Sequence, residues 1–161
     1  MSIGIEPYGD ADAQWVVAQA EAELLVRYGF VGDPEISGAL AEFEGPAGAF
    51  LVARRSGQAQ PAGGVGLRRH DGPDGDGGPI GEVKRLWVDP TCRGLGIGRS
   101  LMAALEAAAV DLGYRSLRLG TGFRQPEAQA LYTRTGWLRQ LLTWDGEPIP
   151  PGWVLFAKGL D

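Results

Sequence analysis

Residues 80–112 join a strand to a helix through a glycine-rich turn, and this order constrains the fold more than any other feature of the sequence. The strand Ile80–Val88 alternates apolar and polar side chains and ends at Asp89-Pro90. The helix over residues 97–112 has an apolar residue at every third or fourth position and stops before Gly113. A strand that leads directly into an amphipathic helix predicts a sheet covered by helices.

The rest of the chain continues this alternation in short segments. Apolar patterning predicts further strands over residues 2–7, 49–54, 62–69, 116–119, 137–142 and 153–158. Helical periodicity predicts helices from Asp10 or Asp12 to Tyr28 and over 126–135, and a weaker helical pattern covers 35–43. Residues 70–79 (HDGPDGDGGP) have the composition of an exposed loop. Because strands follow one another both directly and through helices, we expect an α/β (α+β) fold with a mixed sheet and helices on both faces.

Length and composition limit the class of protein. With 161 residues and no visible linker or repeat, the sequence predicts a single domain over residues 1–161. One cysteine, Cys92, and one histidine, His70, predict no disulfide and no metal site. The sequence has no apolar run of membrane-spanning length and no secretory signal pattern, which predicts a cytoplasmic protein without a membrane partner.

Charge is unevenly distributed along the chain. The net charge of −5 argues against a nucleic-acid partner, because surfaces that bind nucleic acid are basic. Residues 1–53 hold nine acidic residues and one basic residue, a net charge of −8, whereas residues 84–99 hold four basic residues and one acidic residue, a net charge of +3. The local positive charge either marks a site for a small anionic ligand or reflects chance patterning of the surface.

This basic stretch coincides with the glycine-rich turn. Gly94, Gly96 and Gly98 allow the backbone to pass close to a ligand, and the first N–H groups of the following helix lack partners. With Arg93 and Arg99 beside them, these groups suit a phosphate or pyrophosphate. The alternative is a tight strand-to-helix turn that happens to be rich in glycine. The spacing fits neither the dinucleotide fingerprint G-x-G-x-x-G nor the triphosphate loop G-x-x-x-x-G-K-[ST].

Two motifs resemble those of a known family. Val88 and Pro90, followed by residues 93–98 (RGLGIG), resemble the R/Q-x-x-G-x-G/A motif of the GNAT superfamily of N-acetyltransferases. Residues 125–137 (QPEAQALYTRTGW) resemble that family's N-x-x-A-x-x-L-Y-x-x-x-G-F. The resemblance covers roughly residues 49–160, and the first part of the chain only through the order of its elements. It implies a single-domain GNAT-type fold with a mixed, mostly antiparallel sheet of about six or seven strands and a V-shaped opening between the central strands.

The resemblance also implies that the chain binds acetyl-CoA as a co-substrate. The backbone amides that would bind its pyrophosphate are those of Arg93, Gly94, Leu95, Gly96, Ile97, Gly98, Arg99 and Ser100. Backbone groups of Leu86, Trp87 and Val88 would pair with the pantetheine arm and polarise the thioester carbonyl. Gln125 stands where the family commonly has Asn, so its coenzyme contact is expected to be altered, and Trp137 stands in place of Phe.

Two side chains are candidates for proton transfer. An amine with a pKa of about 10.4 is almost wholly protonated at neutral pH, so the reaction needs a base, and the leaving thiolate needs an acid. Glu82 is the candidate base, because some GNAT enzymes have a glutamate at that place on the strand. The alternative is a surface glutamate paired with Lys84 or Arg85. Tyr132, in the L-Y of the second motif, is the candidate acid, and the alternative is an ordinary half-buried tyrosine.

Together these features predict an acetyl-CoA-dependent N-acetyltransferase in which a primary amine of a small molecule or peptide attacks the thioester directly. A non-catalytic module that binds or senses coenzyme A, and an acyltransferase with a different acyl chain, are the alternatives. The acidic residues 1–53 favour a cationic acceptor. The resemblance places the first helix and the last hairpin beside the V-shaped opening between the central strands. The candidates for the acceptor pocket are therefore Tyr28, Trp144, Asp145 and Glu147. Both a monomer and a homodimer are compatible with the sequence.

Overall fold

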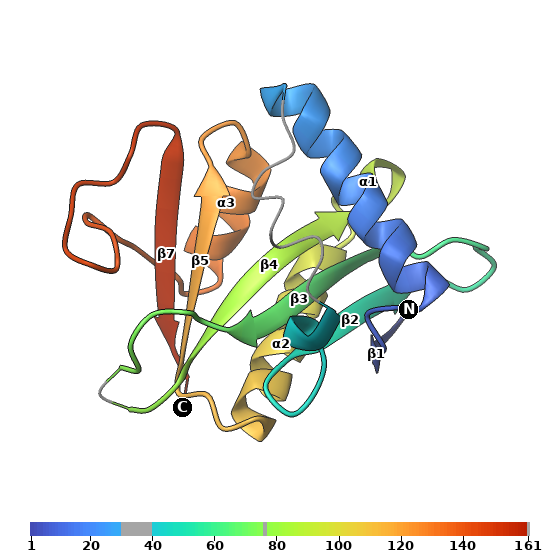
Figure 1. Ribbon diagram of the computed structural model, residues 1–161. Coiled ribbons are helices and arrows are strands. Elements are labelled where there is room, and N and C mark those ends of the chain that lie inside the picture. The colour runs from blue at the N-terminus through green and yellow to red at the C-terminus, as the bar shows by residue number, and fades with distance from the viewer. Residues whose placement is uncertain (30–39, 76, 161) are drawn as a thin grey trace.

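The computed structural model describes residues 1–29, 40–75 and 77–160, and a seven-stranded sheet runs through them (Figure 1). The strand order is β1-β2-β3-β4-β5-β7-β6. The strands are β1 (Ser2–Glu6), β2 (Ala49–Arg54), β3 (Gly63–Arg69), β4 (Ile80–Val88), β5 (Ser116–Gly122), β6 (Leu138–Arg139) and β7 (Trp153–Gly159). β4 and β5 are parallel, and all other neighbouring pairs are antiparallel. The prediction of a mixed, mostly antiparallel sheet is therefore confirmed.

Helices cover both faces of this sheet. In the described residues they are α1 (Ala11–Tyr28), α2 (Ile97–Asp111) and α3 (Pro126–Arg134), with the short 3-10 helices η2 (Leu40–Phe43) and η3 (Pro90–Cys92). Side chains alternate along β2, so that Phe50 packs in one core with Val16 of α1, and Leu51 packs in a second core with Leu101 of α2. α1 therefore lies on one face and α2 on the other (Figure 1). Tyr132 of α3 belongs to the α2 core.

Glycines mark two helix ends near the central strands. Gly29 follows α1 with φ 75°, and its N–H donates to the carbonyl oxygen of Leu25 over 2.8 Å. This left-handed ending satisfies a carbonyl that the last turn leaves without a partner. Gly96 has φ 81° directly before α2. None of the helices in the described parts of the chain is both long and apolar enough to cross a bilayer.

Three expected elements differ from the structure. The predicted strand 116–119 continues to Gly122, because β7 provides antiparallel partners as far as the pair Gly122–Trp153. The predicted strand 137–142 shortens to Leu138–Arg139 at the sheet edge, where the chain turns away through Thr143. Of the predicted helix 35–43, Leu40–Phe43 forms a 3-10 helix, and residues 35–39 lie outside the described residues.

Candidate active site

β4 and β5 separate part-way along their length. Their parallel pairing involves only Ile80, Gly81 and Glu82 of β4. Beyond Glu82, β4 continues to Val88 beside β3, and β5 continues to Gly122 beside β7. Within the described residues, the edge of β4 that faces β5 therefore has backbone N–H and C=O groups without a strand partner. The expected V-shaped opening between the central strands is confirmed.

A β-bulge lies in β4 at the edge of this opening. Between Lys84 and Trp87, β4 has one residue more than the facing segment of β3. Arg85 has φ 59°, a left-handed conformation that is uncommon for a residue with a side chain. The extra residue shifts the alternation, so that Val83 and Leu86 both pack against the α2 core. An arginine does not signal left-handed backbone as a glycine does, and the bulge could not be predicted from the sequence.

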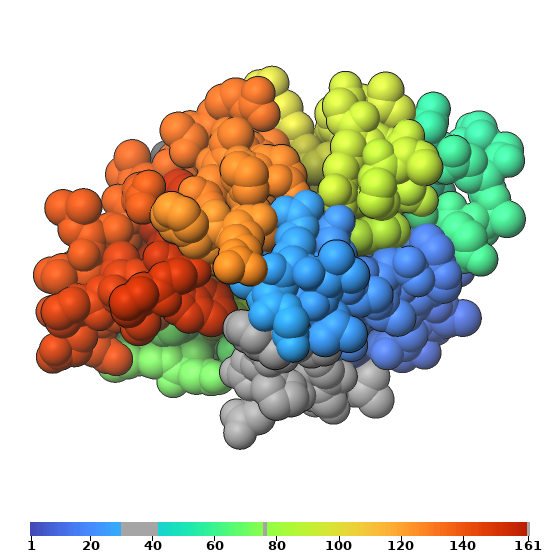
Figure 2. Space-filling view, turned by 90° about the horizontal axis from the view of Figure 1, so that it is seen from above, coloured from blue at the N-terminus to red at the C-terminus, as the bar shows by residue number. Residues whose placement is uncertain are grey.

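Two adjoining cavities occupy the opening. The larger, of about 640 Å³, extends from β4 and β5 to α1. The smaller, of about 440 Å³, extends from the end of β4 to the start of α2 and to α3. Glu23, Leu86, Trp87 and Gln125 line both cavities, so these residues lie where the two meet. In the view of Figure 2, the end of α1 (light blue) lies beside both the segment that follows β4 (yellow-green) and the segment between β5 and α3 (orange).

The glycine-rich turn forms one wall of the smaller cavity. Gly94 and Gly96 have φ values of 82° and 81°. A Cβ at either position would meet no described atom within 4 Å, so these glycines are needed for their backbone conformation rather than for space within the protein. Gly98 differs, because a Cβ there would lie 3.3 Å from the Leu131 side chain and would interfere with the packing of α2 on α3. The turn brings the unpaired N–H groups of the first turn of α2 to this wall.

Most of the predicted coenzyme-binding residues line the smaller cavity. They are Leu86, Trp87, Val88, Arg93, Gly94, Gly96, Ile97, Gly98, Arg99 and Gln125. Leu95 and Ser100 are not among the residues that line it, and the Leu95 side chain is exposed. The structure thus brings together residues of β4, α2 and the start of α3, and their roles toward a coenzyme stay predictions.

Arg93 is held by two contacts that the sequence does not predict. Its Nε donates to the carbonyl oxygen of Val88 over 3.0 Å, and its Nη2 lies 2.6 Å from Oε1 of Glu23 in α1. Glu23 also pairs with Arg27, four residues later on the same helix. This i, i+4 spacing is the one sequence signal that could have drawn attention to Glu23.

Tyr132 lies in the wall of the larger cavity and is buried. Its ring packs against those of Trp137 and Phe156, at centroid distances of 5.9 and 5.5 Å. Burial raises the pKa of the Tyr132 phenol well above its ordinary value, because the charged phenolate would lose its hydration. The hydroxyl therefore stays protonated at neutral pH, which is the form that a proton donor needs.

Glu82 lies where β4 and β5 separate, but it does not line either cavity. Its carboxylate lies 2.7 Å from Lys84 Nζ, 3.4 Å from Arg68 Nη2 and 3.2 Å from His70 Nδ1. Burial by itself would raise the pKa of this carboxyl, but the nearby Lys84 and Arg68 outweigh burial and lower it. The pairing with Lys84, one of the alternatives for Glu82, is therefore present in the structure, and its role as a base stays a prediction.

A family match covers most of this arrangement. The sequence model of the Acetyltransferase (GNAT) family matches residues 16–137, which is more than half of the chain. The chain belongs to the GNAT family of acetyltransferases. The matched residues include most of α1, the separating strands, the glycine-rich turn and Tyr132 of this GNAT domain.

Relatives of the GNAT chain are acetyltransferases by name. It is 44% identical over 87 residues to an IAA acetyltransferase of Azospirillum brasilense, a match that covers 54% of this chain and 52% of that protein. It is 32% identical over 125 residues to an aminoglycoside N(6')-acetyltransferase type 1 of Stenotrophomonas maltophilia, with 74% of this chain and 80% of that protein covered. The chain thus spans about half the length of the first of these relatives.

A solved structure supports the fold of the GNAT chain. An acetyltransferase of the GNAT family from Staphylococcus aureus has a TM-score of 0.75 to this chain at 19% identity, with 99% of this chain and 100% of that chain covered. At this identity the likeness concerns the fold alone. It agrees with the predicted GNAT-type architecture.

Among the described acidic residues near the start of the GNAT chain, Glu23 lines the larger cavity, and Asp33 and Glu35 lie outside the described residues. Several others are paired with basic residues: Glu6 and Asp12 with Arg54, Glu42 with Arg68, and Glu21 with Arg85, which itself lines the larger cavity. Among the described residues, the charged side chains that line the larger cavity are those of Glu23, Lys84, Arg85 and Arg124. Glu23 is the one acidic residue of the described residues 1–29 and 40–53 that lines the larger cavity, and the preference for a cationic acceptor stays a prediction.

The residues predicted near the acceptor pocket separate into two groups. Tyr28 lines the larger cavity. Trp144 instead packs under the guanidinium of Arg118, whose Cζ lies 4.8 Å from the ring centroid, and its ring meets that of His70 edge-on. Asp145 and Glu147 are exposed in the connection from β6 to β7. Of the four candidates, Tyr28 is the one that the structure places in the cavity wall.

Proposed function

We propose that this GNAT chain transfers the acetyl group of acetyl-CoA to a primary amine of a small molecule or peptide. The observation that supports this most is the unpaired edge of β4 beyond Glu82, which opens beside the left-handed turn at Gly94 and Gly96. A strand edge with unpaired amides suits the amide-containing pantetheine arm, and a helix N-terminus suits a pyrophosphate. The two relatives are named for different acceptors, so neither acceptor is carried over to this chain.

In this proposal the chain holds the coenzyme with groups of three segments. Backbone N–H groups of residues 93–100 bind the pyrophosphate, and backbone groups of Leu86, Trp87 and Val88 pair with the arm. Gln125 contacts the arm where the two cavities meet. The bulge at Arg85 interrupts the ladder with β3, and a backbone N–H of Leu86, Trp87 or Val88 would polarise the thioester carbonyl.

The reaction is a direct acyl transfer. The amine nitrogen attacks the thioester carbon, the new C–N bond forms, and the C–S bond breaks with its electron pair on sulfur. Tyr132 donates its hydroxyl proton to this thiolate and regains a proton from solvent. The raised pKa of Tyr132 keeps that proton on the phenol until a strongly basic group forms beside it.

The amine must also lose a proton, and Glu82 is our candidate base. Because its carboxylate does not line either cavity, it would act through water rather than by direct contact. Its lowered pKa keeps it ionised at neutral pH, although it also makes it a weaker base. Glu82→Gln should flatten the acidic limb of the pH profile of kcat/KM, and an unchanged limb would remove Glu82 from the mechanism.

The proposal is tested by two measurements on the same preparation. Release of free thiol from acetyl-CoA is followed over a panel of primary amines, and binding of coenzyme A is measured by calorimetry. Turnover with any amine supports the acetyltransferase. Binding without turnover favours a non-catalytic coenzyme A module, and faster turnover with longer acyl-CoA donors favours a different acyl chain. Absence of coenzyme A binding would overturn the proposal.

A further inference from the structure

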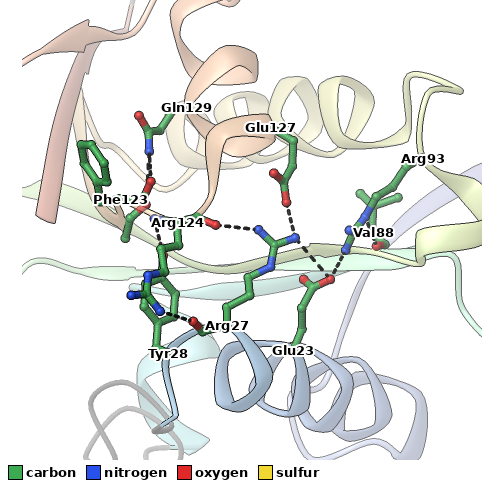
Figure 3. Close-up of polar contacts among 10 residues, drawn as sticks. Glu23, Arg27, Tyr28, Val88, Arg93, Phe123, Arg124, Glu127 and Gln129 are labelled. Carbon is green, nitrogen blue, oxygen red and sulfur yellow. Dashed lines mark hydrogen bonds and ion pairs between the residues drawn. The ribbon is translucent and has the colours of Figure 1, made fainter. Parts of the chain in front are cut away.

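α1 contacts both sides of the opening through two charged residues that lie one helical turn apart. We define the β4 lip as residues 88–93 and the β5 lip as residues 122–127. Glu23 pairs with Arg93 of the β4 lip over 2.6 Å, and Arg27 pairs with Glu127 of the β5 lip. Figure 3 shows both pairs extending from α1, with Glu23 and Arg27 also in contact with each other at 3.6 Å. The signs are opposite in the two pairs: the acidic Glu23 pairs with a basic residue of the β4 lip, and the basic Arg27 pairs with an acidic residue of the β5 lip.

The contact with the β5 lip is made at several points. Arg27 Nη1 donates to the carbonyl oxygen of Arg124 over 2.9 Å, and Arg124 Nη1 donates to that of Arg27 over 3.0 Å. The backbone N–H of Arg124 also donates to the hydroxyl of Tyr28 over 3.0 Å (Figure 3). Such reciprocal bonds fix the distance and the orientation between α1 and the lip, which a single ion pair does not.

The contact with the β4 lip joins three segments. Arg93 donates from Nε to the carbonyl oxygen of Val88, the last residue of β4, while its Nη2 reaches Glu23. Its guanidinium therefore links the end of β4 to α1, and the side of the guanidinium that faces α1 is already paired with Glu23. Arg93 thus joins β4 to α1, in addition to the positive charge that it offers to a pyrophosphate.

Resting on the proposed function, we propose that α1, through Glu23 and Arg27, holds the two lips at a fixed distance and so sets the width of the coenzyme slot between β4 and β5. We call α1 with these two contacts the bracket. Glu23 and Arg27 are positioning residues, because they touch the lips rather than the reacting atoms. The thioester arm lies between β4 and β5, where the lips have no strand pairing of their own among the described residues. Because strand pairing is missing there, the contacts of α1 connect the β4 lip to the β5 lip. In this way the bracket holds the arm against the unpaired edge of β4.

The bracket should affect kinetics more than folding. The side chains of Glu23, Arg27, Arg93 and Glu127 are 22–48% exposed, and exposed ion pairs contribute little to stability. A small change in the slot, however, misplaces the thioester relative to the amine and to Tyr132. Turnover and coenzyme affinity are therefore the sensitive measurements, with the melting temperature as the control for folding.

The first test is a double-mutant cycle on the β5 lip. Arg27→Gln and Glu127→Gln should each lower kcat/KM for acetyl-CoA about fivefold, which corresponds to ~1 kcal/mol. The double variant should lose no more than Arg27→Gln alone, because Arg27→Gln already removes the contact with Glu127. Asp12→Asn is the matched control, since Asp12 is also an ion-paired residue of α1 but reaches Arg54 of β2. The control should keep wild-type kinetics, and additive losses in the double variant would overturn the bracket.

The second test separates the bracket from pyrophosphate binding. S-acetylpantetheine has the thioester arm but no pyrophosphate, so it does not depend on charge at the glycine-rich turn. Glu23→Gln should lower kcat/KM about fivefold with both donors. A loss confined to acetyl-CoA would show that the Glu23–Arg93 pair serves only the pyrophosphate, and no loss with either donor would equally overturn the proposal.

Failure of the proposed function is recognised in the wild-type protein. If wild type binds coenzyme A without turnover, the same variants are compared by the Kd of coenzyme A, which should rise by the same factor for Glu23→Gln and stay unchanged for Asp12→Asn. Unchanged Kd values for all variants would overturn the bracket, whatever the chain does with an amine.

Discussion

The ring of Tyr132 lies 5.5 Å from the ring of Phe156, measured between centroids, so an apolar wall surrounds the phenol at the edge of the larger cavity. Tyr132→Phe keeps this packing and removes only the hydroxyl. If the hydroxyl protonates the leaving thiolate, kcat should fall by about 100-fold or more, while the Kd of coenzyme A stays within about twofold. Steady-state kinetics and calorimetry on the same variant measure both.

Tyr114→Phe is the matched control for this change. Tyr114 is also buried, but its hydroxyl donates to the carbonyl oxygen of Ala47 over 2.5 Å, and it does not line either cavity. This control should keep the wild-type kcat and lose about 1 kcal/mol of unfolding free energy with its hydrogen bond. Equal kcat values for the two variants would show that Tyr132 is not the acid.

The ion pairs of Glu82 make the stability of the protein depend on pH in the acid range. Because Lys84 and Arg68 lower the pKa of this carboxyl below its ordinary value despite burial, the folded state binds its proton more weakly than the unfolded state does. The stabilisation is therefore fully present above the ordinary pKa of about 4.3 and is lost as the pH falls through the lowered value.

Glu82→Gln should remove this contribution. At neutral pH we expect a loss of about 1–3 kcal/mol in the free energy of unfolding, because Arg68 loses a charged partner in a buried position. Denaturant unfolding from pH 7 down to 3 measures the difference between wild type and variant, which should shrink below about pH 4. A difference that stays constant over this range would assign the loss to packing rather than to charge.

The order of the elements could be predicted because local signals mark most of their ends. Gly29 and Gly113 follow the helices that periodicity predicts, and both have left-handed φ values. β5 shows where such signals fail. Gly120 and Gly122 are poor strand formers, yet β7 pairs with every residue of Ser116–Gly122, and tertiary pairing overrides the local preference.

The site could be predicted only where its residues lie close together in the sequence. The glycine-rich turn and the motif around Tyr132 are local patterns, and both segments line the opening. The contact between Glu23 and Arg93 joins residues 70 positions apart, and no local pattern specifies it. The bulge at Arg85 depends on the register between β3 and β4, which a single sequence does not give.

Gly96 offers a direct test of the anion site. Gly96→Asp places a negative charge at the start of α2 and strains a backbone that has φ 81°. We expect the Kd of coenzyme A to rise by about 100-fold, or ~2.7 kcal/mol. Calorimetry measures this rise in the Kd of coenzyme A, and calorimetry with S-acetylpantetheine as a weak competing ligand provides the comparison.

Gly57→Asp is the matched control for Gly96→Asp. Gly57 has φ 79°, and a Cβ there would also meet no described atom within 4 Å, but the residue lies in the turn between β2 and β3. Both variants should lose about 1 kcal/mol of stability from left-handed strain, and only Gly96→Asp should lose coenzyme affinity. A similar loss of affinity in both would show that strain, rather than charge at the anion site, is responsible.

Gly122 allows Tyr28 to approach the β5 lip. A Cβ at Gly122 would overlap the phenol of Tyr28, whose hydroxyl accepts the hydrogen bond from the N–H of Arg124. Gly122→Ala should displace the phenol and break this bond, at a cost of about 1 kcal/mol or 2–4 °C in melting temperature. Gly159→Ala in β7 is the control, because a Cβ there would meet nothing within 4 Å, and it should leave the melting temperature unchanged. In a Tyr28→Leu background the overlap with the phenol is absent, so Gly122→Ala should cost much less there, and equal costs in the two backgrounds would refute the contact.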